Sequence, residues 1–208
     1  YGVGEPIGMG LAISKDREGG GVRIEGEAGG VVPSAADIKA IRTSGDRSAP
    51  IFLGIGQGPV AWTPLHAASA YATLARRGAF IRPGVMLDRA DRGRSSSDLH
   101  LNGAAVSKAL EGLRQAVAEK FGTGNHLTLE NGVQEPLTSV PGTRIWAKTG
   151  TAQAPPLRLD NDHDDKPDAT VKTDHAWFVG LVGNEHDSTP RYAVAVLLEY
   201  GGSGGKTA

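Results

Sequence analysis

Residues 148–151, Lys-Thr-Gly-Thr, bring an ammonium group, two hydroxyls and a glycine backbone together within four positions. On a strand, the period of two places the Thr149 and Thr151 side chains on one face, where two hydroxyls can hold a carboxylate. Gly150 lets a substrate approach the backbone closely, and the Thr151 backbone N–H can stabilise an oxyanion. Lys148 adds a positive charge and a group that holds or relays a proton. The segment therefore predicts a carboxylate-binding strand, although an ordinary surface strand can carry the same four letters.

Three predicted strands must position these groups. Residues 144–153 are the first, and the runs HAWFVGLV (175–182) and YAVAVLL (192–198) follow. The last two runs are apolar at nearly every position, so we expect helices to cover both of their faces. A long loop and then a turn between successive strands favour an antiparallel sheet. The predicted fold class is therefore α+β, an antiparallel sheet covered by helices on both faces.

Two helices are predicted upstream of these strands. Thr63-Pro64 is a strong helix start, Gly78 is a natural stop, and the small-residue face between them consists of Leu65, Ala68, Ala72 and Ala75. A second helix over residues 104–120 follows from apolar residues at spacings of four, three and four: Val106, Leu110, Leu113 and Val117.

The remaining segments are less regular. Residues 1–48 have little periodicity and are interpreted as irregular surface structure, and residues 80–83 as a brief strand. Residues 89–97 and 154–173 are rich in charged or turn-forming residues and are predicted to be loops.

Composition excludes several classes of function. A net charge of −1 gives no broad basic field, so nucleic acid is not expected as a partner. The chain has no cysteine, which excludes disulfides, thiolate catalysis and cysteine-ligated zinc. Its apolar runs are far shorter than the roughly 20 residues of a membrane span. The first residue is Tyr1, and we expect the natural N-terminus to lie upstream.

Three segments of the chain carry a family resemblance. The first is Gly-Ile-Gly-Gln-Gly at 54–58, followed by Trp62-Thr63-Pro64-Leu65 and Ala70-Tyr71-Ala72. The second is IWAKTGTAQ at 145–153, and the third is HAWFVG at 175–180. Their sequence, order and separation resemble the class B penicillin-binding proteins, most closely the cell-elongation type called penicillin-binding protein 2. The resemblance covers the whole chain.

This resemblance implies the penicillin-binding/β-lactamase-like fold and a D,D-transpeptidase that crosslinks peptidoglycan stem peptides through a serine acyl-enzyme. Lys148 and the Thr151 backbone N–H would be catalytic, and Thr149, Gly150 and Thr151 would bind substrate. β-Lactams would be covalent inhibitors, other cell-wall synthesis proteins are candidate partners, and no cofactor or metal is expected. The implied location is the periplasmic side of the membrane, with an N-terminal anchor outside this chain.

The family's other two motifs, Ser-x-x-Lys and Ser-x-Asn or Ser-x-Asp, come before the Lys-Thr-Gly motif. Ser203-Gly-Gly-Lys206 follows that motif and is interpreted as part of a glycine-rich turn, and Ser44-Gly-Asp46 lies too close to Gly54 and is interpreted as a loop. The nucleophile is therefore expected upstream. Residues 1–208 are interpreted as the C-terminal portion of a single transpeptidase domain that is inactive by itself and whose independent folding is in doubt.

Competing interpretations fit less well. The segment before Lys206-Thr207 nearly spells a phosphate-binding loop, but Tyr200 occupies the place of its first glycine. The third glycine of residues 54–58 comes one residue early for a dinucleotide pattern. Residues 160–165 suggest a calcium loop, yet Asp165 replaces its glycine and Val171 its closing glutamate, so a solvated acidic loop is preferred. A zinc site on His163 and His175 would require that loop to fold back.

Two other functions share the fold. One is a catalytically dead module that binds or scaffolds cell-wall proteins, and the other is a β-lactamase or sensor. His175 is expected to make an ordinary hydrogen bond at a strand end, while Trp177 and Phe178 are expected in the core.

Overall fold

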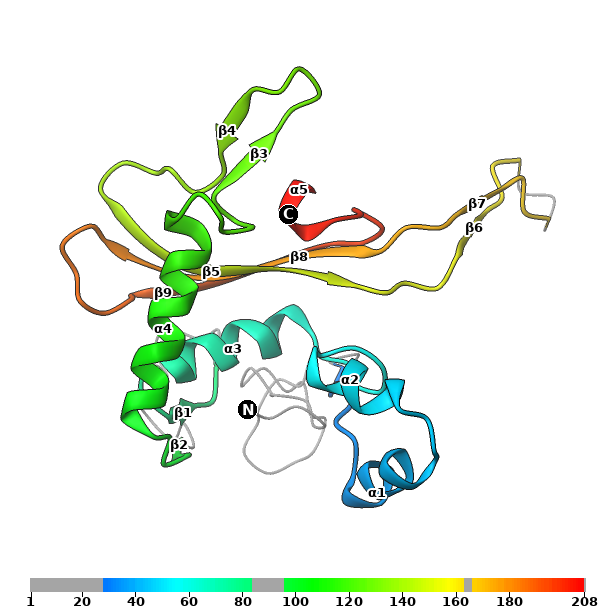
Figure 1. Cartoon of the computed structure of the whole chain (residues 1–208), viewed down its shortest axis with the longest axis horizontal. Helices are drawn as coiled ribbons and strands as arrows, with labels where there is room; N and C mark the ends of the chain where they lie inside the picture. Colours follow the sequence, from blue (N-terminus) through cyan, green and yellow to red (C-terminus); the bar gives the residue numbers. More distant parts are fainter. Residues whose placement is uncertain (1–27, 84–95, 163–165, 208) are drawn as a thin grey trace, which may run out of the picture. The chain divides into compact units, whose positions relative to one another are not determined.

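The structure, a computed structural model, describes residues 28–83, 96–162 and 166–207. The chain divides into two compact units, residues 1–102 and residues 103–208 (Figure 1). Among the described residues, no helix combines the length and apolar character required to cross a membrane.

The described residues of the first unit form three helices and a two-stranded antiparallel pair. The helices are α1 (Ala35–Thr43), α2 (Ser48–Gly54) and α3 (Pro64–Ala75), and β1 (Ala79–Ile81) pairs with β2 (Ser96–Asp98). The interpretation of residues 1–48 as irregular is wrong for α1. Ser34 and Asp37 cap each other's backbone N–H groups, which fixes the first turn of this helix. Residues 1–27 and 84–95 lie outside the described residues. Of the loop predicted over residues 89–97, only Ser96 and Ser97 are described, and they belong to strand β2.

Helix α3 begins where the sequence predicts. The Thr63 hydroxyl accepts a hydrogen bond from the His66 backbone N–H at 3.2 Å, and Pro64 occupies the first turn. Its buried side chains are not the predicted set of Leu65, Ala68, Ala72 and Ala75, which are half-buried. They are His66, Ala67, Ser69 and Thr73, a face turned by one residue, or about 100°. Spacing alone gave the period of this helix but not the orientation of its buried face.

The second unit is built on a three-stranded antiparallel sheet in the order β5-β8-β9. These strands are β5 (Thr143–Ala152), β8 (His175–Asn184) and β9 (Tyr192–Leu198), as the sequence predicts. The register pairs Lys148 with Val179 and Gly150 with Trp177, so the HAWFVG run lies directly beside the Lys-Thr-Gly segment. Figure 1 shows the three strands side by side. The α+β class and the antiparallel sheet are confirmed.

Helix α4 (Gly103–Ala118) packs against β5, and the short helix α5 (Gly204–Thr207) contacts β5 and β8. Val106 and Val117, two of the four apolar residues that predict α4, are buried, and Leu110 and Leu113 are half-buried. Strand β8 is largely buried, but β9 departs from the expectation that helices cover both faces. Its alternate residues are exposed: Tyr192, Val194, Val196 and Leu198.

Two hairpins complete this unit. One joins β3 (His126–Thr128) to β4 (Gln134–Pro136), and the other joins β6 (Leu157–Leu159) to β7 (Ala169–Val171). The second corrects the prediction that residues 154–173 form a loop without strands. Figure 1 shows this hairpin extending outward from the ends of β5 and β8.

The pairing of that hairpin is offset from the pairing of the sheet. The β5–β8 ladder ends at Ala152 opposite His175, and pairing resumes with Leu157 opposite Val171. Residues 153–156 therefore lie opposite residues 172–174, which is one residue fewer. Pro155 and Pro156 fall in this break, and neither has an N–H to donate to a ladder. The break separates the pairing at the hairpin tip from the pairing of the sheet.

Candidate active site

Strand β5 carries the Lys-Thr-Gly segment along one edge of its sheet. Within the part of the chain that the structure describes, β5 has a strand partner, β8, on one side only. Thr149 lies opposite Phe178 and Thr151 opposite Ala176, so alternation places both threonines on one face, as predicted. An edge strand leaves backbone groups available to a ligand that approaches from the open side.

The Lys148 side chain folds over this edge toward the threonine face. Its ammonium group donates to the Thr149 carbonyl oxygen at 2.8 Å, to Thr149 Oγ1 at 3.2 Å and to Thr123 Oγ1 at 3.1 Å. These three acceptors match the three N–H donors of a lysine. Partial burial lowers the pKa of Lys148 below its ordinary value because the charged form loses hydration. The site thus holds one oriented positive charge.

The two hydroxyls of the predicted carboxylate site have different surroundings. Thr149 is 8% exposed, and its Oγ1 lies 2.7 Å from Thr123 Oγ1. Thr151 is exposed, and its Oγ1 accepts a hydrogen bond from the Gly204 backbone N–H at 3.2 Å. The predicted contact of both hydroxyls with one carboxylate and the oxyanion role of the Thr151 N–H remain predictions.

The glycine-rich start of α5 packs closely on the motif. A Cβ atom at Gly204 would overlap the carbonyl oxygen of Gly150 and lie 2.8 Å from that of Trp177, so only glycine fits there. The same segment contains Ser203 and Lys206, and the Lys206 N–H donates to the Ser203 carbonyl at 2.9 Å. Lys206 belongs to α5 and Ser203 directly precedes it, so the segment interpreted as a glycine-rich turn forms a short helix.

The glycine-rich segment before α3 and the aromatic residues of β8 were also singled out in the sequence. Gly56 and Gly58 have φ values of 77° and 79°, which fits a tight turn, and Trp62 is 40% exposed. His175 Nδ1 accepts a hydrogen bond from the Tyr200 N–H at 3.0 Å, so the prediction of an ordinary bond at a strand end is confirmed. Trp177 and Phe178, expected in the core, are half-buried.

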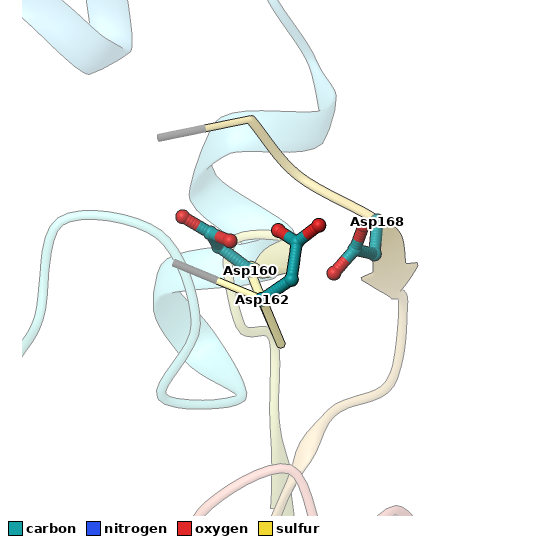
Figure 2. A group of neighbouring side chains, drawn as sticks. All are labelled: Asp160, Asp162 and Asp168. Atoms are coloured by element: carbon teal, nitrogen blue, oxygen red, sulfur yellow. The ribbon is translucent and has the colours of Figure 1, made fainter. Parts of the chain in front are cut away.

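The acidic segment gathers three carboxylates at the β6–β7 hairpin. Oxygens of Asp160, Asp162 and Asp168 lie within 4.8 Å of one another (Figure 2). The Asp168 side chain accepts a hydrogen bond from the Asn161 N–H at 2.7 Å. Asp162 and Asp168 are exposed, which agrees with a solvated acidic loop. His163, Asp164 and Asp165 lie outside the described residues, so the idea of zinc at His163 and His175 remains untested.

Thr123 is the site residue that sequence reasoning missed. It follows α4 and lies 25 positions before Lys148, in the run Gly122-Thr123-Gly124. A hydroxyl between two glycines was a visible signal of a turn that approaches another backbone closely. No periodic pattern connected it with β5.

Comparison with known proteins gives consistent matches. A family model described as the penicillin-binding protein transpeptidase domain matches residues 21–208. The peptidoglycan D,D-transpeptidase MrdA of Acinetobacter baumannii is 28% identical over 197 residues, which cover 90% of this chain and 27% of that protein. The chain thus spans less than a third of this relative's length.

Solved structures of penicillin-binding proteins also resemble the chain, and two of them cover most of its length. Penicillin-binding protein A from M. tuberculosis, in an imipenem acyl-enzyme complex, matches with a TM-score of 0.51 and 26% identity, covering 79% of this chain and 32% of that chain. The transpeptidase domain of Burkholderia pseudomallei penicillin-binding protein 3 matches with a TM-score of 0.58 and 20% identity, covering 95% of this chain and 49% of that chain. The second likeness is one of fold.

Proposed function

The chain belongs to the penicillin-binding protein transpeptidase family, and from this premise we propose that its parent protein is a peptidoglycan D,D-transpeptidase. The observation that best supports this proposal is the position of Lys148-Thr149-Gly150-Thr151 on an edge strand. Both threonine hydroxyls lie on one face of that strand, and an oriented ammonium group lies beside them. This arrangement suits a substrate that ends in a carboxylate and aligns along the strand.

The proposed reaction has two steps. An upstream serine Oγ attacks the carbonyl carbon between the two D-alanines of a stem peptide, the terminal D-alanine leaves with a proton on its nitrogen, and an ester remains. An amine of a second stem peptide then attacks the ester, forming a new amide and returning the proton to the serine. A β-lactam follows the first step only, because its leaving group stays attached to the acyl-enzyme.

Residues of this chain would act on the substrate side of that reaction. The Thr149 and Thr151 hydroxyls and the Lys148 charge would hold the terminal carboxylate, and Gly150 would allow close approach. The Thr151 backbone N–H would donate to the oxygen that becomes negative in the tetrahedral intermediate. Lys148 would also stabilise or relay a proton beside the serine motifs.

The expected setting follows from the substrate. Peptidoglycan lies outside the cytoplasmic membrane, so we place the reaction on the periplasmic side of that membrane. We also propose that an N-terminal segment anchors the parent protein, and that its partners are other cell-wall synthesis proteins. Residues 1–208 would be the C-terminal portion of one transpeptidase domain, and this portion alone would form no adduct with penicillin.

Labelling of the full-length protein with a fluorescent penicillin tests the proposal. We expect a stable covalent adduct, and we expect Lys148→Ala to lower its rate of formation at least tenfold, since one charge-assisted contact contributes about 1.5–3 kcal/mol. Lys108→Ala, on the exposed face of α4, is the matched control and should leave the rate unchanged. A folded protein that forms no adduct would instead be a binding or scaffolding module. Rapid release of hydrolysed penicillin would indicate a β-lactamase.

A further inference from the structure

The turn after α4 holds Thr123 in a fixed position. The Gly122 N–H donates to the Glu119 carbonyl at 2.8 Å, and the Gly124 N–H donates to the Ala116 carbonyl at 3.0 Å. Side chains do not fit on either glycine, because a Cβ at Gly122 would overlap the Ala116 carbonyl and one at Gly124 would lie 2.9 Å from Val117 Cγ1. The turn is thus built to bring one hydroxyl, that of Thr123, against β5.

The Thr123 hydroxyl contacts both polar groups of the motif. Its oxygen accepts from Lys148 Nζ at 3.1 Å and lies 2.7 Å from Thr149 Oγ1. Lys148 Nζ also donates to Thr149 Oγ1 at 3.2 Å, so the three groups form a closed triangle. The triangle joins positions that are 25 and 26 residues apart in the chain.

The direction of the bond between the two hydroxyls decides what Thr149 can bind. A threonine hydroxyl has one proton and two acceptor lone pairs, and a carboxylate has only acceptors. If Thr149 donated to Thr123, its proton would be occupied and a carboxylate would find no donor there. If Thr123 donates, the Thr149 oxygen accepts from Thr123 and Lys148, and its own proton is free.

We propose that Thr123 is a positioning residue for the carboxylate site, donating its hydroxyl proton to Thr149 and accepting from the Lys148 ammonium group. In this role it does not touch the reacting atoms. It orients the Thr149 proton toward the substrate carboxylate and holds the lysine charge at the strand edge. This inference deepens the proposed transpeptidase function and rests on it.

The test compares two β-lactam probes on the full-length protein. Thr123→Val keeps the shape of the side chain and removes the hydroxyl, while Thr123→Ser keeps the hydroxyl. With penicillin we expect Thr123→Val to acylate about five- to tenfold more slowly and Thr123→Ser to stay within about threefold of wild type. With penicillin methyl ester, whose carboxylate is masked, Thr123→Val should acylate within about twofold of wild type.

A second measurement does not depend on catalysis. The pH dependence of Lys148 acetylation by acetic anhydride, followed by mass spectrometry, reports the titration of its amine. Thr123→Val removes an acceptor from the ammonium form, so its midpoint should fall by about half a pH unit. Thr123→Ser should keep the wild-type midpoint. Thr128→Val, an exposed threonine in β3, is the matched control for both measurements.

Two results would overturn this role for Thr123: an equal loss of rate with penicillin and its ester, or an unchanged Lys148 midpoint in Thr123→Val. If the transpeptidase function itself is wrong, wild-type protein forms no adduct with penicillin. The acetylation of Lys148 then still tests the role of Thr123, because it does not require catalysis. If circular dichroism shows that Thr123→Val is unfolded, Thr123→Ala is measured in its place.

Discussion

Lys148 combines a charge with a partly buried position at the edge of β5. Burial disfavours its charged form and lowers its pKa in the folded protein, while three oxygen acceptors keep the ammonium group oriented. The hydrogen bonds preserve a positive charge that desolvation alone would weaken. A lysine in this state is suited to hold an anion and to give up a proton more readily than a lysine in water.

The lowered pKa of Lys148 has a consequence for stability. At pH values between the lowered pKa of the folded state and the higher pKa of the unfolded state, the unfolded chain binds more protons, so the contribution of Lys148 to stability rises with pH. We expect the free energy of unfolding of wild type, minus that of Lys148→Met, to increase from pH 8 to pH 11. Urea denaturation of both proteins at several pH values measures this difference. A difference that stays level or falls over this range would contradict the assigned shift.

At the scale of elements, the short helix α5 depends on one glycine. Gly204 is buried against the carbonyl groups of Gly150 and Trp177, so Gly204→Ala must displace α5 from the sheet or distort β5. We expect a loss of about 1–3 kcal/mol in the free energy of unfolding, the usual cost of overpacking. Because Thr151 accepts from the Gly204 N–H, acylation by penicillin should slow as well.

Gly112→Ala is the matched control for Gly204→Ala. Gly112 lies in the middle of α4, is exposed, and has open space where a Cβ would be added. Alanine there should raise the free energy of unfolding by about 0.5–1 kcal/mol because it restricts the unfolded chain. Urea titration of the two variants should give changes of opposite sign. Equal changes would show that Gly204 has no special packing role.

The sequence predicted those elements whose pattern is strong and local. Thr63-Pro64 gave the start of α3, and the spacing of Val106 and Val117 gave α4. It failed for α1, which has a capping box at Ser34 but no buried residue and only two large apolar residues, Ile38 and Ile41. The β6–β7 hairpin was missed because its strands are three residues long and follow Pro155-Pro156.

The candidate site was likewise predicted only in part. Strand alternation placed Thr149 and Thr151 on one face, whereas the register that sets HAWFVG beside the motif comes from the structure. Thr123 could not be placed, because its contacts span 25 and 26 positions and depend on how α4 ends. Hydrogen bonds between distant hydroxyls leave no periodic trace in a sequence.

At the scale of the whole molecule, the described residues include an exposed apolar surface on β9. Tyr192, Val194, Val196 and Leu198 alternate along β9 and share one face, with exposed fractions of 68%, 41%, 38% and 39%. A contiguous apolar strip on a sheet favours association between copies. We expect the isolated chain to show light scattering that increases with its concentration.

Replacing Val194 and Val196 together by threonine tests this expectation. Threonine keeps the β propensity of valine and adds a hydroxyl, so association should fall while the strand persists. Val133→Thr is the control, since Val133 is 52% exposed in the turn between β3 and β4. If the double variant scatters light as strongly as wild type, association arises elsewhere on the molecule.

The break at residues 153–156 bears on how related sequences can vary. Pairing restarts beyond Pro155-Pro156 with a one-residue offset, so the ladder beside Lys148 is not continuous with the hairpin tip. An insertion or deletion between β6 and β7 would change the tip and leave Gly150 opposite Trp177. We therefore expect the length of the tip to vary more freely than that of β5, whose alignment with β8 is set on the other side of the break.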